Sequence, residues 1–268
     1  GAIPFLLKKI KVPIYATKLT LEMIKKKLTA QKLMDQADLK EVNLKEVVNL
    51  NPFQIKFIRV NHSIPDAVAM AIKTPIGNIL YTGDFKFDQT PINGKTTDFN
   101  SLTAIGKQGV LALLSDSTNA ERRGYSISER VVEKTINNIF ENSTERIIVA
   151  TFSSHLDRLQ QVINAAYKTN RKIAISGRSM IENTELATKL GYLNFPEKNM
   201  LLPVRKINNL ANNKIVYLMT GSQGETMASL SRIARGELRG ITLQEDDTVL
   251  LSATPIPGNE KSVGNIIN

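Results

Sequence analysis

Two residues with metal-binding side chains each follow an apolar, strand-like run. His62 lies in the segment NHSIPD, and Asp84 lies in the segment TGDFKFD. Imidazole and carboxylate groups are both ligands of zinc, but two protein ligands do not complete its coordination sphere. The chain has only two histidines and no cysteine. The pattern therefore predicts one part of a metal site, against the plainer interpretation of a turn histidine and a turn aspartate.

A third acidic group, Asp116, ends another apolar run in the segment LLSDST. Gly83 lets the backbone next to Asp84 approach a ligand closely, and a carboxylate there can bridge two cations. Asp66 is a candidate acceptor for the ring of His62, fixing its tautomer. Three such groups at strand ends on one edge indicate a shared cleft. The alternative for Asp116 is an ordinary turn or helix cap, which its polar neighbours also favour.

Small polar residues fill three strand-to-helix turns in the second half of the chain, TFSS, SGRS and TGSQGE. In a parallel sheet such turns share the carboxyl edge, where helix N-terminal amides favour phosphate. The alternative is plain helix capping. No turn is a P-loop, because GSQG lacks the Lys-Ser/Thr ending. The candidates for phosphate or RNA binding are Phe152, Ser153, Ser154, Arg178, Ser179, Gly221 and Ser222.

The elements that carry these residues change in character along the chain. The first section contains a basic helix and hairpin-connected strands, with a buried strand at the end: residues 20–28, then 53–60, 67–73, 79–82 and 110–114. Ser126 and Glu129 form a capping box that starts a helix. Strands at 146–152, 172–176, 214–220 and 248–253 then alternate with helices at 154–167, 179–190 and 225–234. That rhythm predicts a parallel sheet with right-handed crossovers.

The composition narrows the class of partner. The 268 residues carry a formal net charge of +10 and a pI of about 9.7, which favours a polyanion, nucleic acid before anionic membrane. The alternative is a charge that only keeps the protein in solution. The absence of cysteine excludes disulfides and thiolate metal sites, and no apolar run is long enough to span a bilayer. Aromatic residues make up 6%, which argues against an extensive base-stacking platform.

Long segments of the chain resemble the bacterial ribonuclease J family, metallo-β-lactamase-fold nucleases with an inserted β-CASP domain. They are NHSIPDAVAMAIKTPIGNILYTGDFKFDQTP, GVLALLSDSTNAE, ATFSSHLDRLQQVI, ISGRSM, MTGSQGETMASLSRIARG and SATPIPGNE. The resemblance covers essentially the whole chain. It implies an α/β protein in which residues 1–123 form a partial metallo-β-lactamase αββα sandwich. Residues 124–268 would form a β-CASP domain, incomplete at its C-terminus, with a mainly parallel sheet flanked by helices.

The resemblance also implies roles. His62 corresponds to a metal ligand, Asp84 to the aspartate that bridges two zinc ions, and Asp116 to the β-CASP acidic motif beside the metal centre. Ser154 corresponds to a serine of the phosphate pocket. The family's His-x-His-x-Asp-His motif and its later histidine motifs are missing, so we interpret the chain as an internal fragment and expect it to be inactive alone. His155 stands where the family has asparagine, and we expect an ordinary first-turn helix residue.

The implied function is a zinc-dependent ribonuclease with two Zn²⁺ per complete active site and with Asp84 and Asp116 as catalytic residues. Such an enzyme hydrolyses RNA as a 5′-to-3′ exonuclease and an endonuclease, in RNA decay and rRNA maturation. The resemblance implies RNA as partner, a cytoplasmic location without membrane attachment, and a homodimer or homotetramer of the full-length protein. Two alternatives remain open. One is another metallo-β-lactamase-fold hydrolase acting on DNA or a small ester, and the other is a non-catalytic RNA-binding fragment.

Overall fold

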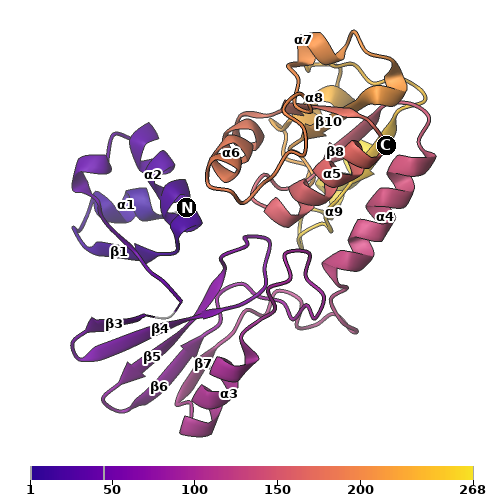
Figure 1. The fold of residues 1–268 in the computed structure, drawn as a ribbon. Helices are drawn as coiled ribbons and strands as arrows, with labels where there is room; N and C mark the ends of the chain where they lie inside the picture. The colour runs from indigo at the N-terminus through magenta and orange to yellow at the C-terminus, as the bar shows by residue number, and fades with distance from the viewer. Residues whose placement is uncertain (1, 45, 268) are drawn as a thin grey trace. The chain divides into compact units, whose positions relative to one another are not determined.

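The computed structural model describes residues 2–44 and 46–267 and divides into two compact units (Figure 1). The first unit extends to Arg130 and the second begins at Val131. The boundary predicted at 123/124 falls in the segment just before helix α4 (Glu129–Asn142), which starts in the first unit and continues in the second. Within the described residues, no helix is long and apolar enough to cross a membrane.

The first unit opens with a small α/β layer. Two short parallel strands pair with each other, and the helix between them carries the lysine-rich stretch; the elements are α1 (Ile3–Leu7), β1 (Pro13–Ala16), α2 (Lys18–Ala30), η1 (Met34–Gln36) and β2 (Asp38–Glu41). Leu7, Leu28 and Leu33 are buried together at its centre. The basic helix predicted at residues 20–28 is therefore present and slightly longer.

A five-stranded sheet forms the rest of the first unit, in the order β3-β4-β5-β6-β7. The strands are β3 (Val47–Leu50), β4 (Phe53–Arg59), β5 (Val68–Thr74), β6 (Gly77–Tyr81) and β7 (Ala112–Leu114). All pairs are antiparallel except β6 and β7, which run parallel and are joined through helix α3 (Phe99–Gln108). The sequence had indicated hairpins only, so this crossover helix was missed. Its Ile105 packs against Ile58 and Ala71 of the sheet.

Strand β7 corrects a second expectation. Its apolar sequence had been interpreted as a buried strand, but Leu113 is 61% exposed and Leu114 is 49% exposed. The physical reason is position, because β7 is an edge strand of the sheet. An apolar run of three to five residues indicates a strand without telling whether its faces are covered.

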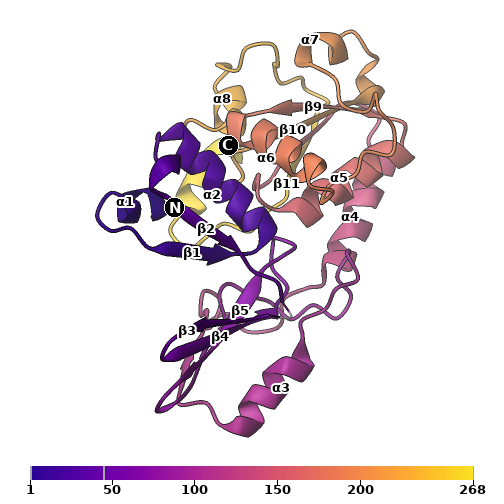
Figure 2. The ribbon, with the colours of Figure 1, turned by 60° about the vertical axis from the view of Figure 1, so that its left-hand side comes forward.

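The second unit contains a four-stranded sheet in the order β11-β8-β10-β9, and every pair is parallel. The strands are β8 (Ile147–Ala150), β9 (Lys172–Ser176), β10 (Ile215–Met219) and β11 (Thr248–Leu251). Helices flank it (Figures 1 and 2): α5 (Leu156–Lys168), α6 (Arg178–Lys189), α7 (Val204–Ile207), α8 (Ser229–Ala234) and α9 (Glu260–Ile267), with η2 (Asn212–Lys214) before β10. Every residue of the central strands β8 and β10 is buried. The predicted α/β class with a parallel sheet flanked by helices is confirmed.

The start of α4 corrects the predicted capping box. The helix begins at Glu129 rather than directly after Ser126. Asp88 Oδ2 accepts a hydrogen bond of 2.8 Å from the amide of Glu129, and Ser128 Oγ accepts one of 3.2 Å from Arg130. A carboxylate distant in sequence therefore caps this helix, which no local pattern can reveal.

Candidate metal centre and phosphate-binding turns

His62, Asp84 and Asp116 leave the first unit's sheet at one edge. Strands β4 and β6 run in the same direction, because each is antiparallel to β5, and β7 is parallel to β6. His62 follows β4, Asp84 follows β6 and Asp116 follows β7. The structure thus brings the three predicted residues to the same end of three strands, as the strand-end pattern indicated.

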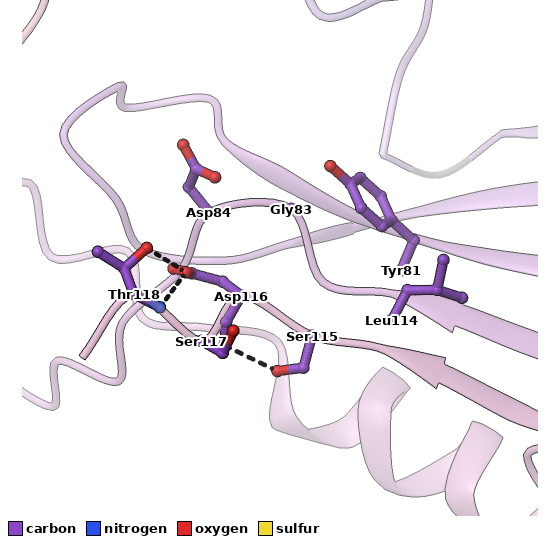
Figure 3. A pocket seen from close by; sticks show the side chains of 8 residues that line it. All are labelled: Tyr81, Gly83, Asp84, Leu114, Ser115, Asp116, Ser117 and Thr118. Atoms are coloured by element: carbon purple, nitrogen blue, oxygen red, sulfur yellow. Dashed lines mark hydrogen bonds between the residues drawn. The ribbon is translucent and has the colours of Figure 1, made fainter. Parts of the chain in front are cut away.

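A cavity of about 420 Å³ lies at this edge (Figure 3), and its lining includes Tyr81, Gly83, Asp84, Asp116 and Thr118. Asp84 is exposed on the loop that follows β6. The loop depends on Gly83, whose φ is +60° and where a Cβ would lie 2.9 Å from the carbonyl oxygen of Val68. A glycine is needed there because a side chain would clash and would strain the backbone.

The carboxylate of Asp116 is fixed by its own turn. Its Oδ1 accepts hydrogen bonds from the amide of Thr118 at 3.0 Å and from the Thr118 hydroxyl at 2.8 Å. The Asp116 amide donates to Thr82 Oγ1 at 3.0 Å, which ties this turn to the loop of Asp84. Sequence analysis missed Thr82 and Thr118, although an aspartate two residues before a threonine is a known turn pattern.

Hydrogen bonds to the turn hold the pKa of Asp116 below its usual range. Those from Thr118 contribute most; burial acts in the opposite direction, and the Phe85 amide and the charge of His62 lower the pKa further. His62 is therefore close enough to Asp116 to affect its titration, although it does not line the cavity itself. An ionised carboxylate suits a site that binds cations or orients a charged group.

His62 is positioned by the residue before it. Asn61 is buried and donates to the carbonyl of Lys95 at 2.7 Å, and its side-chain oxygen accepts from the amide of Thr97 at 2.9 Å. The ring Nδ1 of His62 lies 3.1 Å from Ser63 Oγ. The expected ring partner, Asp66, instead accepts a hydrogen bond of 3.0 Å from the amide of Leu19 in the first turn of α2. The neighbouring serine, rather than Asp66, orients the ring.

The donor types at this edge suit zinc, since an imidazole and a carboxylate are both among its usual ligands. Their number does not suffice. In residues 2–44 and 46–267, no group of three or more His, Cys, Asp or Glu side chains is placed to hold a metal ion. A catalytic zinc takes three protein ligands and an open position, so a metal here needs donors beyond these.

The three polar turns of the second unit also lie at one edge, because β8, β9 and β10 are parallel. They differ in accessibility. In the first turn Phe152, Ser153 and Ser154 are half-buried, and the Ser153 hydroxyl accepts from Asn183 Nδ2 at 3.0 Å. His155 is the N-cap of α5, its Nδ1 accepting from the amide of Arg158 at 3.3 Å.

Arg178 and Ser179 open helix α6 and are both exposed. The N-cap of that helix is Gly177, with φ of +103° and no side-chain cap. A Cβ at Gly177 would lie 2.8 Å from Thr220 Oγ1, so only glycine fits. The first turn of α6 therefore offers amides, a hydroxyl and a guanidinium on one accessible surface.

The third turn is closed by its own unit. Gly221 is buried against Leu230, and Ser222 is only 2% exposed. The next residue, Gln223, donates to the carbonyl of Thr254 at 3.0 Å and accepts from the amide of Ile256 at 2.7 Å. This turn fastens the segment that follows β11, so Arg178 and Ser179 are the more accessible phosphate candidates.

Comparison with known proteins shows which family the chain resembles. The profile of the ribonuclease J β-CASP domain matches residues 144–268. Ribonuclease J 1 of Streptococcus pyogenes is 46% identical over the whole chain, and ribonuclease J2 of Bacillus subtilis is 42% identical over 97% of it. The chain spans about half the length of these relatives, 48% and 47% respectively.

A crystal structure of a protein of unknown function from Enterococcus faecalis V583 superposes on 77% of this chain and 53% of its own with a TM-score of 0.55. Its 16% identity supports likeness of fold only. The second unit, with its parallel sheet and matched profile, is of the β-CASP class. The chain as a whole belongs to the ribonuclease J family.

Proposed function

We propose that this chain is part of a metal-dependent ribonuclease that hydrolyses RNA phosphodiesters as a 5′-to-3′ exonuclease and an endonuclease. The observation that carries the proposal is the shared strand edge in a ribonuclease J chain. There Asp84 and Asp116 line one cavity and the charge of His62 acts on Asp116. RNA decay and rRNA maturation in the cytoplasm are the processes that such an enzyme serves.

In this proposal His62 and Asp84 would hold zinc, two ions in the complete enzyme, which supply a water activated near neutral pH. Asp84 would present its exposed carboxylate from the rigid Gly83 loop. Asp116, ionised and fixed by Thr118, would orient the groups around it. Among the turn candidates, Ser154, Arg178 and Ser179 would grip phosphates by hydrogen bonds and charge.

The remaining ligands would come from parts of the full-length protein outside this sequence. We therefore expect the 268 residues alone to be inactive. RNA is the proposed partner, and the full-length enzyme is proposed to assemble as a homodimer or homotetramer.

Replacing Asp84 with alanine in the full-length protein tests the catalytic assignment. Loss of a residue that supports a metal ligand typically costs 10–100-fold, so loss of a ligand should reduce nuclease activity by about 100-fold or more. Circular dichroism should show a normal fold. Asp35→Ala is the matched control, because Asp35 is an exposed carboxylate of the same unit. Unchanged activity in Asp84→Ala would refute the assignment.

Two alternatives have separate tests. A hydrolase acting on DNA would cleave a DNA of matched sequence faster than the RNA. A non-catalytic RNA-binding role is favoured by the incomplete ligand set of the described residues. It would leave the full-length protein able to bind RNA without cleaving it. Zinc stoichiometry of the 268-residue chain adds a readout besides activity, and two tightly bound ions per chain would contradict the expected incompleteness.

A further inference from the structure

A groove of about 390 Å³ lies along the outer side of strand β9 in the second unit. It is lined by Ile175, Ile181, Thr184, Glu185, Leu201, Leu202 and Pro203. Most of the lining side chains are apolar. Ile181 and Leu201 among them are each 39% exposed. Ligand sites typically combine such apolar walls with a few placed polar groups.

Thr184 supplies one of these polar groups. The residue is 2% exposed and lines the groove. Among the residues that the structure describes, nothing lies within hydrogen-bond distance of its Oγ1. A buried hydroxyl without a partner costs free energy. A molecule in the groove that bonds to Thr184 would therefore recover that cost.

The edge of β9 supplies a second set of polar groups. Ile173 donates to the carbonyl of Met200 at 2.8 Å and accepts from the amide of Leu202 at 2.9 Å. The chain then leaves the strand at Pro203, which precedes α7. In a strand, residues two apart direct their backbone groups to the same side. The amide and carbonyl of Ile175 therefore face the groove beyond the end of this short ladder.

The groove begins beside the accessible turn of α6. Arg178 precedes Ile181 by three residues, so the two side chains are neighbours on one face of the helix. From Arg178 to Thr184 the helix rises by about 9 Å. A phosphate held by Arg178 and Ser179 would thus lie at one end of a cavity whose walls are apolar and whose floor carries hydrogen-bonding groups.

We propose that this groove is a base-binding subsite for single-stranded RNA, with the adjoining phosphate on Arg178 and Ser179. The base packs between the apolar side chains, and its edge bonds to Thr184 Oγ1 and to the backbone of Ile175. Glu185 at the rim accepts from an exocyclic amino group, as carboxylates do with cytosine. The subsite favours cytosine over uracil. The inference rests on the proposed function, since it names where the same substrate is held.

Fluorescence anisotropy of the 268-residue chain with labelled oligo(C) and oligo(U) of about ten nucleotides tests the subsite. We expect tighter binding of oligo(C). Thr184→Val keeps the shape and removes the hydroxyl, and it should weaken oligo(C) binding about fivefold. Leu201→Glu, at the exposed rim, should weaken both oligomers. Arg178→Gln should weaken both and reduce the salt dependence by about one phosphate contact.

Thr188→Val is the matched control, because Thr188 lies one turn later on α6 and its hydroxyl already donates to the carbonyl of Thr184. It should bind like the unmodified chain. If Thr184→Val and Leu201→Glu also bind like the unmodified chain while Arg178→Gln is weakened, the groove holds no base and the subsite is refuted. If the unmodified chain binds neither oligomer, the RNA-binding role proposed for this unit fails as well.

Discussion

The two sheets of the molecule differ in how far their strands are buried. In the second unit the central strands β8 and β10 are buried throughout, and one face packs on Leu230 and Ile233 of α8. In the first unit β7 is exposed along its length, and the cavity with Asp84 and Asp116 lies at its end. A sheet covered on both faces supports its own stability, whereas the open sheet places polar, reactive groups at an accessible edge.

Both units fix loops through polar contacts, which differ in how deeply they are buried. In the second unit, the loop before β11 is held by a buried ion pair, in which Arg146 bonds to both carboxylate oxygens of Asp247 at 2.7 and 2.5 Å. In the first unit, the buried side chains of Asn61 and Asp88 hold loops by hydrogen bonds to the amides of Thr97 and Glu129, and Lys86 adds an ion pair with Glu129 at 2.7 Å. The Arg146–Asp247 pair is the more buried of the two ion pairs, so its loss should cost more stability.

Arg146→Ala should have the largest effect on stability. The change leaves the Asp247 carboxylate, 2% exposed, without its partner, and breaking a buried pair typically costs about 3–5 kcal/mol. Burial disfavours the charged guanidinium, but Asp247 and Tyr217 together outweigh this and raise the pKa of Arg146. Urea denaturation measures the loss. Lys172→Met, which removes the partly buried partner of the exposed Glu197, should cost less than about 1 kcal/mol. Equal effects of the two changes would mean that burial of the Arg146–Asp247 pair adds nothing to its contribution.

Truncation at matched strand positions tests the two sheets directly. Ile148→Ala in β8 removes a fully buried side chain and should cost about 2–5 kcal/mol. Leu113→Ala in β7 removes one that is 61% exposed and should change the free energy of unfolding by less than about 1 kcal/mol. Denaturation curves of both variants provide the measurement. A large cost at Leu113 would mean that β7 is covered in solution.

Much of the difference between the two sheets could be predicted from the sequence, and part of it could not. Repeated strand, turn and helix predicted the parallel sheet of the second unit, because that rhythm is local and regular. The sequence also predicted that His62, Asp84 and Asp116 lie just after strands, since each follows an apolar run. Their gathering at one edge then depends only on strand direction.

Contacts between residues far apart in the sequence could not be predicted from it. The cap of α4 comes from Asp88, 41 positions before Glu129, and the closure of the Ser222 turn comes from Gln223 bonding to the segment after β11. The exposure of β7 depends on which strands are its neighbours. Periodicity and turn chemistry report on local conformation, so they cannot supply these long-range facts.

Gly83→Ala tests the rigidity of the open edge. The substitution forces a side chain into a left-handed conformation, at a cost of about 1–2 kcal/mol, and brings its Cβ to 2.9 Å from the carbonyl of Val68. We expect faster amide hydrogen exchange in β6 and the following loop, with β8 and β10 unchanged. Gly94→Ala is a control, because its φ of +69° imposes similar strain but its Cβ meets no atom within 4 Å among the described residues. Identical exchange in the two variants would show that the contact with Val68 is unimportant.

The smallest effect concerns the cap of α4 and depends on pH. Burial raises the pKa of Asp88, but hydrogen bonds from Glu129, Ser128 and Thr90 and the charge of Lys86 together lower it below its usual range. A carboxyl group whose pKa is lower in the folded state stabilises that state above its unfolded pKa. The contribution disappears as pH falls through the folded value.

Asp88→Asn should therefore destabilise the start of α4 by about 1 kcal/mol at neutral pH. The difference from the unmodified chain should shrink as the pH falls below about 4, the ordinary carboxyl pKa in the unfolded chain, towards the lower pKa of folded Asp88. Hydrogen exchange of the Glu129 amide, which donates to Asp88, reports this locally. Asp35→Asn, at an exposed site, should behave like the unmodified chain throughout. A difference at Glu129 that stays constant from neutral pH to pH 3 would mean that the cap acts through shape rather than charge.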